Sequence, residues 1–263
     1  MIVEQMLKNA QTPLLHIADV SGSALFQGDC LDIMPLIPDN SIDCIITDPP
    51  YGTTACKWDS VIDFNLMWEQ LNRIIKPNGA IVLFGSEPFS SALRMSNIKM
   101  YRYDWVWEKE QAVNIMQIKK RAGKTVENIC VFYKKQPTYN PQMRKHDGKP
   151  VTNKVKSGFG ALVDSSRKKP FEYKDTGYRY PTQVLKYQSE RLKGYVHPTQ
   201  KPVALFEYLI KTYTNEGDLV LDNCMGSGTT GVSCKNLNRN FIGIELDEKY
   251  CEIAKKRIEE ANQ

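Results

Sequence analysis

The tetrapeptide Asp48-Pro49-Pro50-Tyr51 combines residue types that suit chemistry on a flat base carrying an amino group. It follows residues 42–47, a short apolar run rich in β-branched side chains that predicts a buried strand. The prolines end that strand, because neither can donate a hydrogen bond to a sheet. Ligands bind at the carboxyl ends of strands in open α/β sheets. There the carboxylate and a proline carbonyl could accept both amino hydrogens while the tyrosine ring stacks on the base.

A second motif, Gly226-x-Gly228-x-x-Gly231, follows the apolar run 219–222 and opens a predicted helix. This spacing is typical of dinucleotide-binding turns. Glu245 ends the next predicted strand, nineteen residues after Gly226, where a carboxylate can accept both ribose hydroxyls. The pattern serves any adenosine ligand, so it does not separate NAD from S-adenosylmethionine. No Lys-Ser or Lys-Thr pair follows the glycines, which disfavours a P-loop.

The chain of 263 residues carries a net charge of +5 that is unevenly spread. Residues 134–193 hold 15 Lys and Arg against 5 Asp and Glu, whereas the rest of the chain holds 20 against 25. With aromatic residues interleaved, the basic stretch favours nucleic-acid binding over a merely solvated loop. Seven cysteines without a Cys-x-x-Cys pair indicate no disulfide framework and no metal site. No apolar run predicts a membrane span or a signal peptide, and we expect an intracellular protein.

The elements that position these motifs follow from hydrophobic periodicity. Strands are predicted over residues 23–28, 42–47, 79–85, 103–108, 129–134, 219–222 and 240–245. Helices are predicted over 63–76, 86–95, 203–213 and 247–261, with Ser86 and Asp247 as N-caps. Their alternation predicts an α/β fold with a mostly parallel sheet. Residues 52–60 are expected to form a mobile loop and residues 109–125 a flexible lid.

In this order the features resemble the amino-group DNA methyltransferases, which methylate N6 of adenine or N4 of cytosine. The order is the permuted, "beta" one, in which His197-Pro198-Thr199-Gln200-Lys201-Pro202 precedes the glycine motif. The resemblance covers nearly the whole chain apart from its first twenty residues and the recognition region. It implies a Rossmann-like S-adenosylmethionine-dependent methyltransferase fold with an inserted DNA-recognition region. The implied parts are a catalytic half (1–135), the target-recognition region (136–196) and a cofactor-binding half (197–263).

The resemblance also assigns residues. The catalytic set is Asp48, Pro49, Pro50 and Tyr51. The implied contacts to S-adenosylmethionine come from Asp29, Cys30, Asp48, Thr199, Lys201, Asp222, Asn223, Gly226, Ser227, Gly228, Thr229, Thr230 and Glu245. Asn223-Cys224 replaces the family's common Pro-Phe, which puts an aromatic contact to the cofactor in doubt. From the basic stretches, DNA contacts are predicted for Lys119, Lys120, Arg121, Arg144, Lys145, Lys154, Lys156, Arg167, Lys168, Lys169, Arg179 and Arg191.

The expected substrate is N6 of an adenine that has left duplex DNA. The alternatives within the family are N4 of cytosine and N6 of adenine in RNA, and those outside it are an NAD-binding oxidoreductase and a non-catalytic DNA-binding protein. C5-cytosine chemistry is disfavoured because no cysteine follows a proline. The resemblance further implies a cytoplasmic, nucleoid-associated protein encoded by a bacterium or phage. It leaves open whether the protein forms a homodimer and whether it has a cognate restriction endonuclease.

Overall fold

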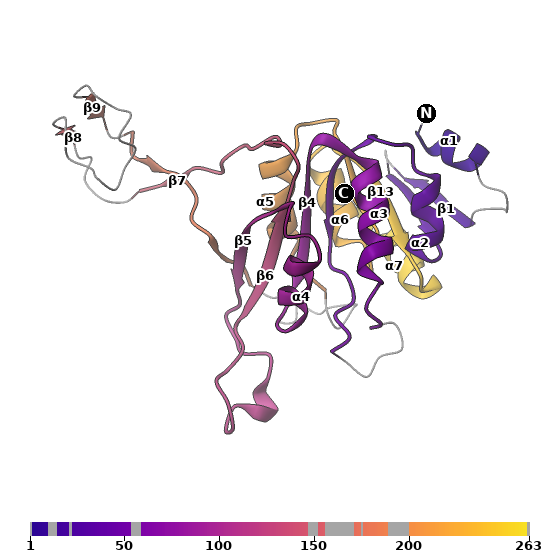
Figure 1. Ribbon diagram of the computed structural model, residues 1–263, viewed down its shortest axis with the longest axis horizontal. Coiled ribbons are helices and arrows are strands. Elements are labelled where there is room, and N and C mark those ends of the chain that lie inside the picture. Colours follow the sequence, from indigo (N-terminus) through magenta and orange to yellow (C-terminus); the bar gives the residue numbers. More distant parts are fainter. Residues whose placement is uncertain are drawn as a thin grey trace. The chain divides into compact units, whose positions relative to one another are not determined.

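The computed structural model describes residues 2–9, 15–20, 23–53, 59–146, 152–155, 171–174, 176–188 and 200–261 (Figure 1). The chain forms two compact units. One consists of residues 1–140 and 183–263, and the other of residues 141–182.

A nine-stranded sheet forms the centre of the larger unit. Its order is β1 (Leu15–Val20), β2 (Ser23–Gln27), β13 (Asn240–Glu245), β12 (Leu219–Asp222), β3 (Ile42–Thr47), β4 (Ile75–Gly85), β6 (Val126–Phe132), β5 (Tyr101–Glu108) and β11 (Val184–Lys186). The five neighbours from β2 to β4 are parallel. Strands β1 and β6 run antiparallel to their neighbours. The predicted α/β fold with a mostly parallel sheet is therefore confirmed.

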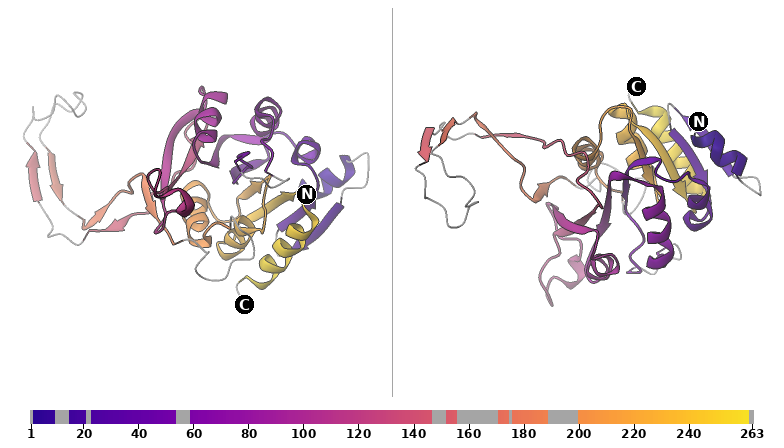
Figure 2. Two further views of the ribbon diagram at one scale, coloured as in Figure 1. Left: turned by 90° about the horizontal axis from the view of Figure 1, so that it is seen from below. Right: turned by 45° about the horizontal axis from the view of Figure 1, so that its top comes forward.

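Helices cover both faces of this sheet (Figure 2). One face carries α1 (Ile2–Asn9), α2 (Cys30–Ile33), the 3-10 turn η1 (Met34–Leu36), α3 (Phe64–Ile74) and α4 (Phe89–Ser96). The other carries α5 (Val203–Tyr213), α6 (Thr229–Asn236) and α7 (Glu248–Glu260). Strand β4 shows the alternation that buries both faces, since Ile81 and Leu83 pack on the first side, Val82 and Phe84 on the second.

The parallel strands bring distant parts of the chain to one edge of the sheet. Asp222 and Glu245 are the last residues of β12 and β13, and Asp48 directly follows β3. Thr47 and Asp222 are 175 positions apart in the sequence, yet their side chains are hydrogen-bonded. Strand β5 runs parallel to β4, because both are antiparallel to β6. Lys109, which follows β5, therefore lies at the same edge.

Two predicted helix caps have different outcomes. Asp247 caps α7, its carboxylate accepting hydrogen bonds from the amides of Lys249 (2.9 Å) and Tyr250 (3.2 Å). The prediction for Ser86 was wrong, because α4 begins at Phe89 with Pro88 as its N-cap and no side-chain cap. The Glu87–Pro88 peptide bond is cis, and proline is well tolerated at the start of a helix. Ser86 is thereby left as a buried residue at the end of β4.

The smaller unit contains short antiparallel pairs that its irregular sequence did not predict. Strand β7 (Arg144–Lys145) pairs with β10 (Tyr178–Arg179), and β8 (Thr152–Val155) pairs with β9 (Phe171–Lys174). Strand β11, also within the predicted recognition region, instead extends the main sheet beside β5. The role of residues 136–196 in recognition and their limits stay predictions.

Among the described residues, no helix is long and apolar enough to cross a membrane. Within the same part of the chain, no group of three or more His, Cys, Asp or Glu side chains is placed to hold a metal ion.

Candidate active site

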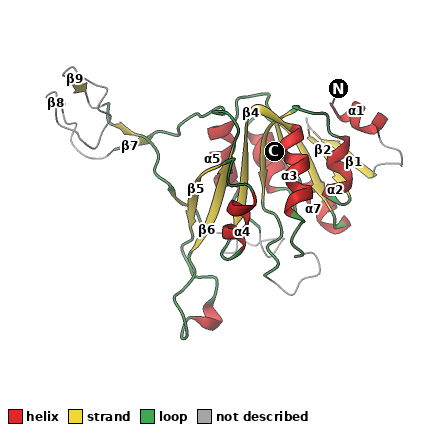
Figure 3. Cartoon of the chain, in the orientation of Figure 1, coloured by secondary structure: helices red, strands yellow, loops and turns green. Residues whose placement is uncertain are grey.

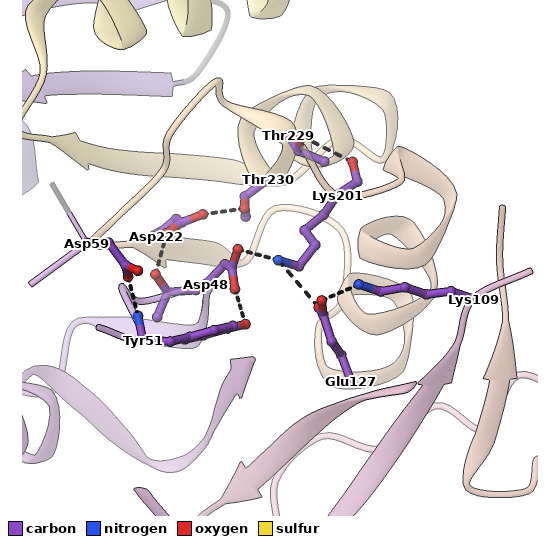
Figure 4. A network of polar contacts seen from close by, with 10 residues as sticks. Asp48, Tyr51, Asp59, Lys109, Glu127, Lys201, Asp222, Thr229 and Thr230 are labelled. Atoms are coloured by element: carbon purple, nitrogen blue, oxygen red, sulfur yellow. Dashed lines mark hydrogen bonds and ion pairs between the residues drawn. The ribbon is translucent and has the colours of Figure 1, made fainter. Parts of the chain in front are cut away.

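The Asp48 carboxylate stands where β3 ends and is held by two side chains (Figure 4). The Tyr51 hydroxyl donates to its Oδ1, and the Lys201 ammonium donates to its Oδ2. The Asp48 side chain is 23% exposed, so it remains accessible to a ligand. Each carboxylate oxygen can accept more than one hydrogen bond, so both retain capacity for further donors. The prolines predicted to end the strand do so, with Pro49 buried beneath the turn.

Lys201 belongs to a chain of alternating charges that crosses the site. Its ammonium lies 3.5 Å from Glu127 Oε2, and Glu127 Oε1 accepts from the ammonium of Lys109. All three side chains are almost buried. Burial disfavours the charge on Glu127, but Lys201 and Lys109 outweigh it and lower the pKa of this carboxyl. Burial likewise opposes the charge on Lys201, whereas Asp48 and Glu127 raise its pKa.

Asp59 fixes the backbone at the end of the Asp48-Pro49-Pro50-Tyr51 tetrapeptide and just after it. Its Oδ1 accepts from the amides of Tyr51 (2.8 Å) and Gly52 (2.9 Å), and its Oδ2 accepts from the Thr53 amide (2.8 Å). Gly52 has a φ of +65°, and a Cβ there would lie 2.8 Å from Val61 Cγ2. The turn thus depends on a buried carboxylate and on glycine. Residues 54–58 of the predicted mobile loop lie outside the described residues.

The Tyr51 ring forms part of the wall beside Asp48. One contact is a stacked arrangement with Phe89, with ring centroids 5.0 Å apart and an interplanar angle of 29°. Burial, followed by the nearby Asp48 charge, raises the pKa of its hydroxyl, so the phenol stays a hydrogen-bond donor. Stacking of this ring on a substrate base stays a prediction.

The glycine loop joins β12 to α6 and is anchored by Asp222. Asp222 Oδ1 accepts from the Thr47 hydroxyl (2.6 Å) and the Cys224 amide (3.1 Å), and Oδ2 accepts from the Thr230 hydroxyl. Burial raises the pKa of Asp222 to about 6 despite these bonds. Gly228, with a φ of +76°, is the N-cap of α6, and a Cβ there would lie 2.7 Å from that of Ala254. Only glycine fits both this backbone conformation and this packing.

Glu245 lies beside the glycine loop at the end of β13. Its Oε2 accepts from the Gly226 amide (2.8 Å) and its Oε1 from the Asp247 amide (3.0 Å). Burial raises the pKa of this carboxyl. Each oxygen can accept one further hydrogen bond, so the carboxylate can still bind a pair of hydroxyl groups.

Further residues predicted to contact the cofactor surround this loop. Asp29 caps α2 by accepting from the Leu31 amide (2.8 Å), and Cys30 is the first residue of that helix. Ser227 accepts a hydrogen bond from Arg257 through its hydroxyl oxygen (2.9 Å). The Oδ1 atom of Asn223 is buried without a hydrogen-bond partner, which leaves it available to a ligand.

One pocket of about 750 Å³ unites the two halves of the site. Its walls include Asp48 and Tyr51 from the catalytic half, and Asp222, Gly226 and Glu245 from the glycine-loop half. This volume is within the range of roughly 300–1,000 Å³ that is typical of small-molecule sites. The hydroxyl of Ser86, buried and without a hydrogen-bond partner, also lines the pocket. The pocket can therefore hold a ligand against the glycine loop and a second group against Asp48.

Comparison with known proteins identifies the family. The sequence profile of the family described as DNA methylase, N6_N4_Mtase, matches residues 42–256. The chain belongs to this DNA methylase family. A protein named Type II methyltransferase M.HpaI, from Haemophilus parainfluenzae, is 31% identical to this methylase over 239 residues, covering 85% of this chain and 70% of that protein. DNA adenine methyltransferase YhdJ of Escherichia coli (strain K12) is 29% identical over 254 residues, covering 90% and 83%.

Solved structures share the methylase's fold. M1.HpyAVI has a TM-score of 0.59 at 26% identity, covering 90% of this chain and 98% of that one. The PvuII DNA methyltransferase (cytosine-N4-specific) has a TM-score of 0.67 at 18% identity, covering 93% and 89%. The predicted Rossmann-like methyltransferase fold is confirmed.

The DNA contacts predicted for the methylase fall on separate parts of the chain. Lys119, Lys120 and Arg121 are exposed on the connection between β5 and β6. Arg144 and Lys145 form β7, Arg179 belongs to β10, and Lys154 belongs to β8. Outside the described residues lie Lys156, Arg167, Lys168, Lys169 and Arg191, as does the predicted cofactor contact Thr199. All of these assignments stay predictions.

Three residues of the site were missed by the sequence analysis, namely Asp59, Lys109 and Glu127. Each acts through a partner that is distant in sequence or through backbone amides, which no local pattern reveals. A weak signal existed for two of them, because Lys109 and Glu127 flank the predicted strands over 103–108 and 129–134. A charged residue at the edge of an apolar strand is too common to have singled them out.

Proposed function

We propose that this methylase transfers a methyl group from S-adenosylmethionine to N6 of an adenine in duplex DNA. The observation that carries the proposal is the placement of Asp48 in one pocket with Glu245 and the glycine loop. Support for adenine comes from the relative named DNA adenine methyltransferase and from aspartate at the first position of the catalytic motif. The crystal structure of an M1.HpyAVI-SAM complex, whose sequence is 28% identical to this chain, supports the cofactor.

The cofactor-binding half suits S-adenosylmethionine chemically. Glu245 would accept the ribose hydroxyls, Asp29 would contact the adenine, and the glycine loop would allow close approach of the ligand. When bound, the cofactor supplies a methyl group on a positively charged sulfur. The carboxylates of Asp48 and Asp222 in the same pocket favour that positive charge.

The catalytic half suits an exocyclic amino group. The lone pair of such a nitrogen is delocalised into the ring, so the free amine is a poor nucleophile. Hydrogen bonds from the amino group to the Asp48 carboxylate and the Pro49 carbonyl favour a nitrogen whose lone pair is free. Lys201 and Tyr51 fix the orientation of that carboxylate. Such positioning contributes up to roughly 7–11 kcal/mol in well-oriented reactions.

The target base must leave the double helix, because Asp48 lines a pocket and cannot reach an amino group inside a base stack. We therefore propose base flipping, with Tyr51 stacked on the extruded base. A stacking contact of this kind contributes about 1–3 kcal/mol.

The cellular role rests on the relatives. M.HpaI is named a Type II methyltransferase, and we propose that this chain likewise acts beside a cognate restriction endonuclease. We also propose a homodimer that works on DNA in the bacterial cytoplasm, associated with the nucleoid. Sedimentation of the purified protein, and protection of modified DNA from an endonuclease encoded beside it, would test these points.

The decisive experiment is incubation with methyl-labelled S-adenosylmethionine and unmethylated bacterial DNA, followed by nucleoside mass spectrometry. N6-methyladenine is the expected product, and sequencing of the modified sites would give the recognition sequence. N4-methylcytosine would retain the fold and the pocket but overturn the choice of base. Label in RNA alone would overturn the substrate class.

A further inference from the structure

Residues 109–125, here named the finger, form an ordered projection between β5 and β6 (Figure 3). At its base, the Lys109 amide donates to the Thr125 carbonyl (2.7 Å), and the Val113 amide donates to the Lys124 carbonyl (3.0 Å). Asn114 braces the finger, accepting from the Lys124 amide (2.6 Å) and donating to the Ala122 carbonyl (3.0 Å). A 3-10 turn, η2 (Ile115–Gln117), lies towards its far end. The predicted flexible lid is thus a hydrogen-bonded hairpin.

The finger exposes large apolar side chains that contribute nothing to the core. Met116 is 97% exposed, Ile115 67% and Ile118 53%. Contiguous exposed apolar groups on a soluble protein commonly mark a contact surface. Lys119, Lys120 and Arg121 follow directly and are exposed as well. An apolar tip beside a basic run fits a partner that offers both an apolar gap and negative charge.

The finger adjoins the pocket. It leaves the sheet at the edge where Asp48 lies, because β5 is parallel to β4. Three of its residues, Lys109, Val113 and Lys124, line the pocket that contains Asp48. Val113 is two positions before Ile115, so a partner that delivers a group to Asp48 passes along the base of the finger, next to the segment that carries the exposed apolar residues.

We propose that the finger inserts Ile115 and Met116 into the gap that an extruded base leaves in the DNA stack, while Lys119, Lys120 and Arg121 bind the adjacent phosphates. The inference rests on the proposed function. Apolar wedges between base steps are an established means of distorting a duplex, and methionine adapts its shape to irregular gaps. Five basic residues against one acidic residue in the finger favour DNA over the same surface of a second copy.

The test compares paired with unpaired targets. The variant Ile115→Ser/Met116→Ser is measured on a duplex that carries the wild-type methylation site, and on the same duplex with a mismatch opposite the target base. We expect kcat/KM to fall about tenfold or more on the paired duplex and to recover on the mismatched one, where the extruded state costs less. The affinity for S-adenosylmethionine should not change. A 2-aminopurine probe at the target position should lose its fluorescence increase in the variant on paired DNA only.

The matched control is Met95→Ser/Ile98→Ser, which removes two exposed apolar residues outside the finger and the pocket. Its kcat/KM should equal that of the wild type. The proposed wedge would be overturned if the finger variant lost kcat/KM equally on paired and mismatched DNA, or lost it on neither. Conversion of a dimer to a monomer by the finger variant would overturn it too, since the tip would then be a subunit contact. Failure of the proposed function would appear separately, as a wild-type protein that methylates no DNA.

Discussion

The two halves of the pocket hold their carboxylates in different ways. In the half of the pocket around Asp48, the predicted catalytic half, Asp48 and Glu127 alternate with Lys201 and Lys109, so that each of these two carboxylates has a cation as partner. In the cofactor half, Glu245 accepts hydrogen bonds from two backbone amides, and Asp222 accepts from one backbone amide and two hydroxyls. Lys201 and Lys109 offset the charges of Asp48 and Glu127, whereas Asp222 and Glu245, which have no cation among their described contacts, add negative charge for a cationic ligand.

Removal of Asp48 would break the catalytic half most severely. We expect Asp48→Ala to lower methyl transfer by about a thousandfold or more, comparable to losing a preorganised polar group in other enzymes. Asp48→Asn keeps one acceptor oxygen, so its rate of methyl transfer should fall less than that of Asp48→Ala. Binding of S-adenosylmethionine should remain measurable by calorimetry for both variants, because the glycine loop and Glu245 are intact. The proposed mechanism would be wrong if Asp48→Ala kept near-normal turnover.

The paired charges of the catalytic half can be tested through stability. Lys201→Met leaves Asp48 and Glu127 facing each other without their shared cation, and should lower the free energy of unfolding by about 3 kcal/mol or more. Urea denaturation measures this loss. Adding Asp48→Asn to Lys201→Met should recover part of it, because one unpaired carboxylate is gone.

The control for that comparison is Lys186→Met. Lys186 pairs with Glu108 at 3.1 Å, but its side chain is 77% exposed, so the loss should be at most about 1 kcal/mol. Equal losses for Lys201→Met and Lys186→Met would show that the buried chain of charges has no special role in stability.

The same contrast explains what could be predicted from sequence. The glycine loop and Glu245 lie at turns and strand ends that are close in sequence, so the intervals between these residues predict their role. The Asp48 tetrapeptide is local too, and its strand was predicted within the observed limits. Glu127 could not be predicted in its role, because its contacts depend on which strands become neighbours. Asp59 could not be predicted either, because it acts on backbone amides of the loop, which leave no residue pattern. Ser86 was wrongly predicted to cap the helix. The N-cap of α4 is Pro88, two residues later, and the Ser86 hydroxyl lines the pocket instead.

Among the described residues, no cation contacts Asp222, so burial dominates the pH dependence of its charge. Burial raises its pKa from an ordinary value of 3.8 to about 6, so the folded protein holds this proton more tightly than the unfolded chain. Its contribution to stability is therefore complete below pH 4 and is lost as the pH rises through 6. Relative to Asp222→Asn, the wild type should lose roughly 3 kcal/mol of unfolding free energy between pH 4 and pH 7.5.

Urea denaturation of both proteins across that pH range measures the difference. Asp39→Asn, which makes the same substitution at an exposed carboxylate, serves as control. The predicted raised pKa would be contradicted if the difference in unfolding free energy between wild type and Asp222→Asn stayed constant with pH. It would also be contradicted if the wild type became more stable than Asp222→Asn as the pH rises.

Substitution of Glu245 tests the cofactor half, and among these predictions it has the smallest expected effect, a change in cofactor affinity. Glu245→Gln replaces one acceptor oxygen by a donor, and should weaken S-adenosylmethionine binding about 10- to 100-fold, the range for hydrogen bonds to charged groups. Calorimetry should give the same loss for S-adenosylhomocysteine, the uncharged thioether product, because the ribose hydroxyls are common to both ligands. A loss confined to S-adenosylmethionine would instead assign Glu245 to the sulfonium charge. DNA affinity should not change, and Glu248→Gln, at the exposed start of α7, should bind both ligands like the wild type.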